Sequence, residues 1–470
     1  MNTIDIIVVS VYLIGLFGWA IYIGLKETAE DYLVLSRSAP FVLVAFSVIS
    51  TWVGTGTTVA TAASGYDTGI SLGFTAVGGG IVGILVAAWF APRLKWFGDK
   101  FRAHTIGDFF STRYSRNSRF AASALILSIY ILLTAAQFVG LSTLLHVWTG
   151  IQFEIVIWFA ALSTIAYTAF AGIKSDFYTD VVHFIVMFFA IFLILLPLTL
   201  GDIGGLSALQ TLPDSYFDPF AYGGLSFFIA GLIFGAGSVF VTMEVWQRVY
   251  ASASAKIAQR ALLLSVIIIV SFYVVSSFFG MAAHIVNPNL VNRDQAIFFL
   301  MKEYLPAGVL GLGLAGFMAV FISTVNSTIM VASATLTKDF YKGILSQDAD
   351  DNKLLIAGRI STLLCGTVGF VVAVLFPDLV ALSVNSLFML LVLVPPIVGG
   401  FFWSKATSLA AFTSTVIGIS VMLGFLAIDS ATAFVPGFLA SLITFIMVSI
   451  FSEHKAEENL SIVRGWNVKS

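Results

Sequence analysis

The stretch of sequence that decides the fold is Ser50-Thr-Trp-Val-Gly-Thr-Gly-Thr-Thr58, a polar and glycine-broken segment inside an apolar run over residues 41–66. It lies roughly a dozen residues into that run, which is mid-membrane depth at the helical rise of about 1.5 Å per residue. In hydrocarbon, a helix is interrupted only where its freed backbone groups meet protein, water or an ion. The segment therefore predicts a broken membrane helix. The alternative is that its glycines only let neighbouring helices pack closely.

The composition agrees with a membrane protein throughout. Of 470 residues, 59% are hydrophobic and 10% are charged, and the mean hydropathy is +1.00, which excludes a soluble globular chain. The net charge of −2 offers no basic excess for a phosphate backbone, so nucleic acid is excluded as a partner. The single cysteine, Cys365, cannot form a disulfide within one chain. The histidines have no metal-ligand spacing and adjoin no nucleophile motif, so we expect no enzyme.

Apolar runs of about 20 residues, the length that crosses the hydrocarbon, follow one another along the chain. They predict an all-α integral membrane protein of about thirteen transmembrane helices, with no soluble domain of any size. The predicted spans are 4–25, 41–66, 72–92, 120–148, 154–172, 179–200, 224–247, 261–284, 307–335, 356–376, 379–402, 407–427 and 433–452.

The basic residues orient these spans. Of the 23 Lys and Arg residues, only Arg293 and Lys302 fall on one side of this topology, and the other 21 fall on the opposite side. Basic loops stay in the cytoplasm. We therefore expect a multi-pass protein of the plasma membrane with its N-terminus outside and its C-terminus cytoplasmic.

A second glycine-rich segment, Gly231-Leu-Ile-Phe-Gly-Ala-Gly-Ser238, lies at a similar depth in the seventh span and predicts a second helix break. The alternative is again that its small residues only let helices pack closely. The two segments are five helices apart in spans that run in opposite directions, as an inverted repeat of five helices requires. The predicted units are an extra N-terminal helix (1–40), a first five-helix repeat (41–200), a second inverted repeat (224–402), two C-terminal helices (403–452) and a cytoplasmic tail (453–470).

The ninth span carries a face of small side chains at four-residue spacing, Ala315, Ala319, Ser323 and Ser327. Thr324 adds a second hydroxyl beside Ser323 about halfway through the bilayer. Two hard oxygen ligands suit a small monovalent cation. The alternative is that both hydroxyls only bond back to the preceding helical turn.

Acids inside spans are costly and are therefore functional candidates. Asp176 and Asp180 share one helical face at the cytoplasmic start of the sixth span, where they could attract or release a cation. Asp176 lies beside Lys174 and can instead be solvated. Glu154 and Glu244 lie near span ends, where we expect them to snorkel or to cap a helix.

Several motifs resemble the sodium/solute symporter family, whose inverted five-plus-five helix core is called the leucine-transporter fold. The most specific is the stretch from Ala315 to Ser327 with its Ser-Thr pair, followed by Thr337-Lys-Asp-Phe-Tyr341. The others are Ala171-Gly-Ile173 leading to Tyr178-Thr-Asp180, and Trp246-Gln-Arg248. The resemblance implies that the transported cation is a sodium ion. It implies sodium ligands from the hydroxyls of Ser323 and Thr324 and the backbone carbonyls of Ser50, Val53 and Val320, with Asp180 at the inner exit.

The residues at the first break depart from one branch of that family. The proline-permease branch resembles this chain less well, because it has an aspartate where this sequence has Trp52. The run Thr51-Trp-Val-Gly54 resembles the choline-transporter branch, in which an aromatic face could meet a quaternary ammonium. Trp52 can equally be a packing or lipid-facing aromatic. The expected solute contacts are Trp52, Thr55, Thr57, Phe234 and Ser238.

We therefore expect sodium-coupled symport of a small organic solute by alternating access, the solute being an amino acid, a monocarboxylate, a vitamin or a quaternary amine. The expected partners are the solute, sodium and the lipid bilayer, with no obligate protein partner. One alternative is a solute-sensing receptor without transport, although only about 18 residues follow the last predicted span. Another is proton coupling on the same fold, for which Asp180 is the available titratable group.

Overall fold

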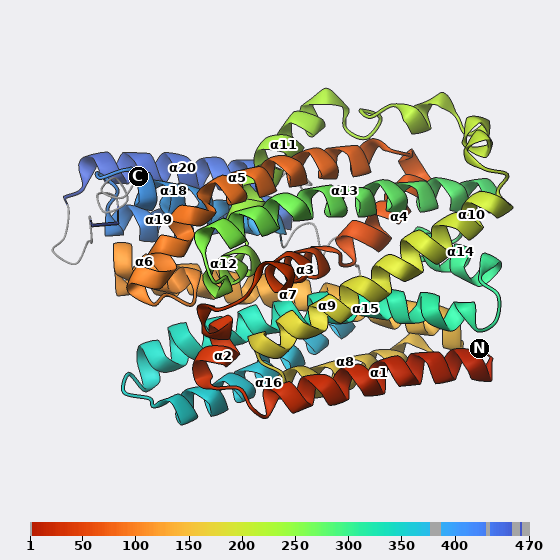
Figure 1. The fold of residues 1–470 in the computed structure, drawn as a ribbon. Helices are drawn as coiled ribbons and strands as arrows, with labels where there is room; N and C mark the ends of the chain where they lie inside the picture. The colour runs from red at the N-terminus through yellow and green to blue at the C-terminus, as the bar shows by residue number, and fades with distance from the viewer. Residues whose placement is uncertain (1, 377–386, 429–432, 454–460, 463–470) are drawn as a thin grey trace.

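The computed structural model describes residues 2–376, 387–428, 433–453 and 461–462, and nearly all of its secondary structure is helical. The helices lie side by side along a common direction (Figure 1). Each helix satisfies its own backbone hydrogen bonds, as lipid requires, and its side chains pack against the neighbouring helices. In Figure 1, α3, α9, α13 and α15 occupy the middle of the molecule, and α1, α8 and α16 form one flank.

Eleven helices of the described residues are long and apolar enough to cross a membrane, and a twelfth span comes from one bent helix pair. Each of them matches a predicted span. The predicted span 379–402 falls partly outside the described residues, so the count of thirteen stays a prediction. The long helices are α1 (Thr3–Gly24), α5 (Ser71–Phe101), α7 (Arg116–Thr149), α8 (Phe153–Phe170), α9 (Ile173–Phe188) continued by α10 (Leu196–Asp202), α11 (Gly224–Val241), α13 (Ala255–Val286), α15 (Val309–Thr335), α16 (Asp351–Leu375), α19 (Ser408–Ala427) and α20 (Phe434–Phe451).

The bent pair is the predicted first break. Helix α3 (Phe41–Trp52) is followed by Val53, whose φ of −83° and ψ of 76° are not helical. The chain re-enters a helix over Gly56–Thr68, which includes α4 (Thr61–Thr68), at an angle of 56° to α3. The break predicted from residues 50–58 is confirmed.

The second break lies elsewhere than predicted. Helix α11 runs without interruption through Gly231–Ser238 and ends at Val241, so the prediction of a break at those glycines is wrong. The chain leaves the helix at Thr242, where ψ is 127°, and α12 (Met243–Ala251) begins directly after it.

The glycines of α11 serve helix packing instead. A Cβ built on Gly235 would lie 2.9 Å from the Cα of Gly79 in α5, and a Cβ on Gly79 would lie 2.6 Å from the carbonyl oxygen of Gly231. Real Cβ atoms do not approach this closely, so only glycine permits this contact between α5 and α11. Close packing through small residues, the alternative to a helix break, is therefore the correct explanation for this segment.

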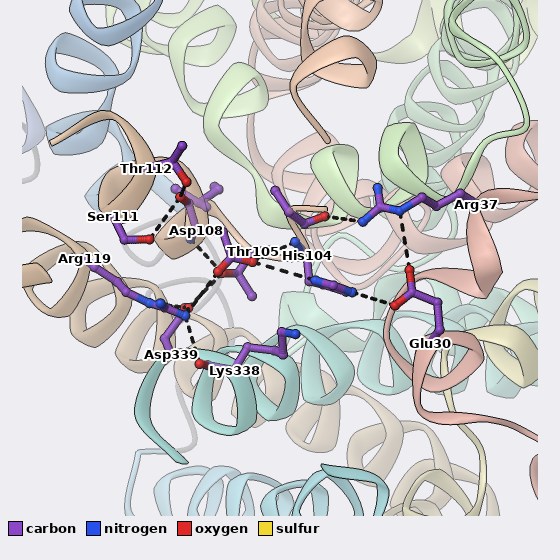
Figure 2. A network of polar contacts seen from close by, with 12 residues as sticks. Glu30, Arg37, His104, Thr105, Asp108, Ser111, Thr112, Arg119, Lys338 and Asp339 are labelled. Atoms are coloured by element: carbon purple, nitrogen blue, oxygen red, sulfur yellow. Dashed lines mark hydrogen bonds and ion pairs between the residues drawn. The ribbon is translucent and has the colours of Figure 1, made fainter. Parts of the chain in front are cut away.

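A network of ion pairs joins three of the loops for which we predict the same side of the membrane (Figure 2). Glu30 accepts a hydrogen bond from His104 Nε2 at 2.9 Å and lies 3.4 Å from Arg37 Nε. Arg119 Nη2 lies 2.7 Å from Asp339 Oδ1 in the turn that continues α15. The predicted topology requires these loops to meet at one end of the bundle, on the left in Figure 1.

Candidate sodium and solute site

A cluster of oxygen atoms lies where the end of α3 meets the middle of α15. The hydroxyl of Ser323 donates to the carbonyl oxygens of Ser50 at 3.0 Å and Val320 at 3.2 Å. The hydroxyl of Thr324 reaches the carbonyl oxygens of Val320 at 3.1 Å and Thr51 at 3.2 Å. Because α3 stops at Trp52, the carbonyls of its last turn lack partners within the helix and turn to these hydroxyls. The structure thus brings the two predicted hydroxyls and two of the three predicted carbonyls together.

The close approach of the two helices depends on a glycine. A Cβ on Gly54 would lie 2.7 Å from Thr324 Oγ1. The third predicted carbonyl belongs to Val53, the first residue past the end of α3, and Val53 is fully buried. The structure places the carbonyl of Thr51, rather than that of Val53, next to the Thr324 hydroxyl.

This donor set has a definite chemistry. It consists of neutral carbonyl and hydroxyl oxygens, which are hard ligands that suit a monovalent cation, and it contains no thiolate or imidazole for a transition metal. In the described part of the chain, no three His, Cys, Asp or Glu side chains gather in the manner of a divalent-metal site. If the two hydroxyl protons rotate away, the same oxygens that now share hydrogen bonds can coordinate Na⁺.

Asp180 lies one hydrogen bond away from the oxygen cluster. Its backbone carbonyl accepts from the Ser50 hydroxyl at 2.7 Å, and its Oδ2 accepts from the Ser47 hydroxyl at 2.6 Å. Its Oδ1 is buried and has no hydrogen-bond partner among the described residues. Its Oδ2 also lies 3.5 Å from Arg248 Nη2, so the carboxylate pairs with Arg248 and leaves one acceptor atom, Oδ1, unused.

Asp176 is buried rather than solvated, so that interpretation is wrong. Lys174, its neighbour in sequence, pairs with Asp31 at 3.0 Å instead. Asp176 Oδ2 accepts from Arg248 Nη2 and from the Ser327 hydroxyl, each at 3.0 Å. The physical reason is that α9 begins at Ile173, six residues before the predicted span, so this first turn is already inside the bundle.

Arg248 in α12 holds the helices around the cluster together. Its Nε donates to Ser47 at 3.1 Å and its Nη2 donates to Thr51 at 2.7 Å, both on α3. The same guanidinium contacts Asp176 on α9 and Ser327 on α15. A buried guanidinium is tolerated because its fork of donors meets acceptors from three helices.

A cavity of about 120 Å³ adjoins the same break. The predicted solute contacts Trp52, Thr55 and Thr57 line it. Thr324 lines it as well and therefore belongs both to the cavity wall and to the oxygen cluster.

The other two predicted solute contacts lie outside this cavity. The ring of Phe234 packs against Phe434 of α20, with ring centroids 5.1 Å apart. The hydroxyl of Ser238 bonds back to the carbonyl of Gly235 at 2.9 Å. Both follow from the uninterrupted course of α11, which turns these side chains to its neighbours.

Sequence reasoning missed several polar residues of the cavity wall, among them Gln137 and Glu244. Gln137 accepts from the backbone N–H of Thr55 at 3.2 Å and donates to its hydroxyl at 2.9 Å, which holds the broken helix against α7. An amide in the interior of the apolar span 120–148 was an available signal. Glu244 was expected to snorkel or cap a span end, but it is buried and lines the cavity, because the helix break at Thr242 places it at membrane depth.

Comparison with known proteins agrees with this geometry. Residues 32–418 match the model of the sodium:solute symporter family. The chain is 25% identical to the sodium/pantothenate symporter of Haemophilus influenzae, with 97% of this chain and 98% of the relative covered. It is 23% identical to the sodium/glucose cotransporter of Vibrio parahaemolyticus (100% and 94% covered) and 25% identical to the high-affinity proline transporter of Bacillus subtilis (92% and 95% covered).

Two solved structures share the fold. The outward-open, substrate-bound structure of a Na⁺-coupled sialic acid symporter superposes with a TM-score of 0.86 at 19% identity and covers 97% of this chain and 99% of its own. The nucleobase-cation-symport-1 transporter Mhp1 superposes with a TM-score of 0.61 at 13% identity, covering 94% and 99%. The chain belongs to the sodium:solute symporter family and is a sodium-coupled transporter of a small solute, not an enzyme.

Proposed function

We propose that the oxygen cluster between α3 and α15 binds the transported sodium ion and that the adjoining cavity binds the solute. The ligands are the hydroxyls of Ser323 and Thr324 with the carbonyls of Ser50 and Val320, and the buried carbonyl of Val53 is a further ligand. The observation that carries this proposal is the position of Thr324, whose side chain belongs to both sites.

That shared residue explains coupling. Sodium at the cluster fixes α3 against α15, and this contact also sets the position of the cavity wall at Gly54 and Thr324. Ordering the wall raises the affinity for solute, and by linkage bound solute raises the affinity for sodium by the same factor. An inward sodium gradient and membrane potential then drive entry, since one charge crossing 100 mV releases about 2.3 kcal/mol.

Release of the ion proceeds past Asp180 in this proposal. Its Oδ1 is buried and accepts no hydrogen bond from the described residues, while its backbone carbonyl bonds to the Ser50 hydroxyl, so the carboxylate is available to a cation that leaves the cluster. We assign this side to the cytoplasm, because the joined loops of Figure 2 carry basic residues and basic loops stay inside. The N-terminus is then outside the cell and the C-terminus is cytoplasmic.

The alternating movement divides the chain into the units expected from its repeats, residues 41–200 and 224–402. The two breaks support this division, since each falls in the first span of its unit, after Trp52 and at Thr242. The remaining units are residues 1–40, 403–452 and 453–470, with no obligate protein partner. The solute is an amino acid, a monocarboxylate, a vitamin or a quaternary amine that Trp52, Thr55 and Thr57 contact.

The test is uptake into proteoliposomes of labelled amino acids, monocarboxylates, pantothenate, sugars and choline, with and without an inward sodium gradient. We expect one class of solute to accumulate only with sodium and this dependence to be lost in the Ser323→Ala/Thr324→Ala double variant. Thr335→Ala is the matched control, because its hydroxyl lies on the same helix and bonds back to Val331 at 2.9 Å. Equal uptake on a proton gradient, or an unaffected double variant, would contradict the proposal.

A further inference from the structure

Among the described residues of the cavity wall, one carries a carboxylate, Glu244 in the first turn of α12. Glu244 is only 7% exposed, and the other described residues that line the cavity are uncharged. Accepting the proposed solute cavity, we infer that Glu244 selects solutes that carry a cationic nitrogen.

The first argument is that the charge of Glu244 has no counterion in the part of the chain that the structure describes. Among the described residues, no Lys, Arg or His side chain lies within 4.0 Å of its carboxylate, as the salt bridges of this part of the chain show. Arg248 lies one helical turn further along, but its guanidinium is directed to three hydroxyls and two other carboxylates, those of Ser47, Thr51, Ser327, Asp176 and Asp180. A buried charge is costly unless it is paired, so a cationic solute that forms an ion pair with Glu244 offsets this cost and binds more tightly.

The second argument comes from the aromatic side chains of the same cavity. Trp52 at the end of α3 and Tyr273 of α13 both line it. An aromatic face attracts an ammonium group by its quadrupole, most strongly for tryptophan and in a desolvated site. A carboxylate and two aromatic rings are therefore available to one cationic group, while an anionic solute meets no basic side chain among the described lining residues.

A purely structural role for Glu244 makes a different prediction. Its Oε2 accepts a hydrogen bond from the Tyr130 hydroxyl, and that hydroxyl in turn accepts from the backbone N–H of Met243 at 2.8 Å. A carboxylate near a helix N-terminus also interacts favourably with the helix dipole. If Glu244 only secures the start of α12, removal of its hydrogen bond and removal of its charge should have equal effects.

Two variants separate these roles. Glu244→Gln removes the charge and keeps a hydrogen-bond acceptor for Tyr130, whereas Tyr130→Phe removes the hydrogen bond and keeps the charge. Glu244→Asp keeps the charge on a shorter side chain and serves if Glu244→Gln does not fold. The readout is ligand-induced thermal stabilisation of purified protein at fixed pH and saturating sodium, with choline, lysine, putrescine, pantothenate and glucose as probes.

We expect at least one cationic probe to stabilise the wild type, and we expect Glu244→Gln to bind it at least about 30-fold more weakly. Tyr130→Phe and Glu244→Asp should keep the preference for that probe. The inference is overturned if no cationic probe binds the wild type, if pantothenate or glucose binds in preference, or if Glu244→Gln binds the cation as tightly as Tyr130→Phe does. This readout needs no ion gradient. Retention of sodium-driven uptake in the Ser323→Ala/Thr324→Ala variant, together with an intact preference for the cationic probe, would therefore refute the sodium assignment alone.

Discussion

Gly54→Ala tests the close contact between α3 and Thr324, the residue that the proposed sodium and solute sites share. A Cβ at this position would lie 2.7 Å from Thr324 Oγ1, 3.0 Å from Thr324 Cγ2 and 3.2 Å from Gln137 Oε1. Thr324 is β-branched and stiff about its first side-chain torsion, so it cannot simply swing away. The variant should therefore push α3 and α15 apart at the oxygen cluster and weaken sodium binding.

The size of the effect follows from the geometry. Ordinary contact of a Cβ begins at 3.4 Å, so Thr324 Oγ1 must move by about 0.7 Å. Overpacking of this kind costs about 1–3 kcal/mol. In our proposal sodium holds α3 against α15, so the sodium-bound state bears that cost. Because about 1.4 kcal/mol corresponds to a tenfold change, the sodium concentration for half-maximal uptake should rise about 5- to 140-fold.

The assay is the sodium dependence of uptake in proteoliposomes at a fixed solute concentration. Gly80→Ala is the control, since a Cβ at Gly80 meets nothing within 4 Å and the residue lies in the helical interior of α5. If Gly54→Ala shows the same half-maximal sodium concentration as the wild type and as Gly80→Ala, the close contact does not contribute to the sodium site.

Two further predictions concern buried charge and pH. Arg248→Met leaves Asp176 buried without its partner, which should cost about 3–5 kcal/mol of stability, and thermal unfolding in detergent should show a large fall in Tm that the exposed Arg260→Met does not share. Burial lowers the pKa of His104 below its usual 6.5, and the hydrogen bond from His104 lowers the pKa of Glu30 to about 2. Below pH 6.5, His104 takes up a proton more readily in the unfolded chain than in the folded protein, so the free energy of unfolding should fall as the pH drops. Below its usual pKa of 4.5, Glu30 does the same and lowers the free energy of unfolding further. The Tm of His104→Gln should fall less steeply than that of the wild type from pH 7 to 4.5, and parallel Tm curves would contradict this.

The apolar runs and the first break could be predicted from sequence because lipid imposes strict rules on both. A span needs length and hydrophobicity, and Thr55 and Thr57 with their neighbouring glycines interrupt one at mid-depth. The hydroxyls of Ser323 and Thr324 lie beside the α3 carbonyls as the resemblance implied. Twelve of the predicted spans match helices or the bent pair, within several residues at their ends.

The second break could not be located because glycine has two uses in membrane helices. In α11, Gly231 and Gly235 permit contact with α5, and the interruption falls at Thr242, which has no glycine beside it. A span end that is wrong by a few residues also changes the apparent depth of an acid. For this reason solvation was an open alternative for Asp176, and Glu244 was expected to snorkel or to cap a span end, although both are buried within the bundle.

The central claim is that the hydroxyls of Ser323 and Thr324 bind the transported ion. The most direct test is equilibrium binding of ²²Na⁺ to purified protein without any gradient, for the wild type, Ser323→Ala/Thr324→Ala and Thr335→Ala. We predict saturable binding that unlabelled sodium displaces in the wild type and in Thr335→Ala, and its loss in the double variant. Undiminished ²²Na⁺ binding by a folded double variant would contradict the claim.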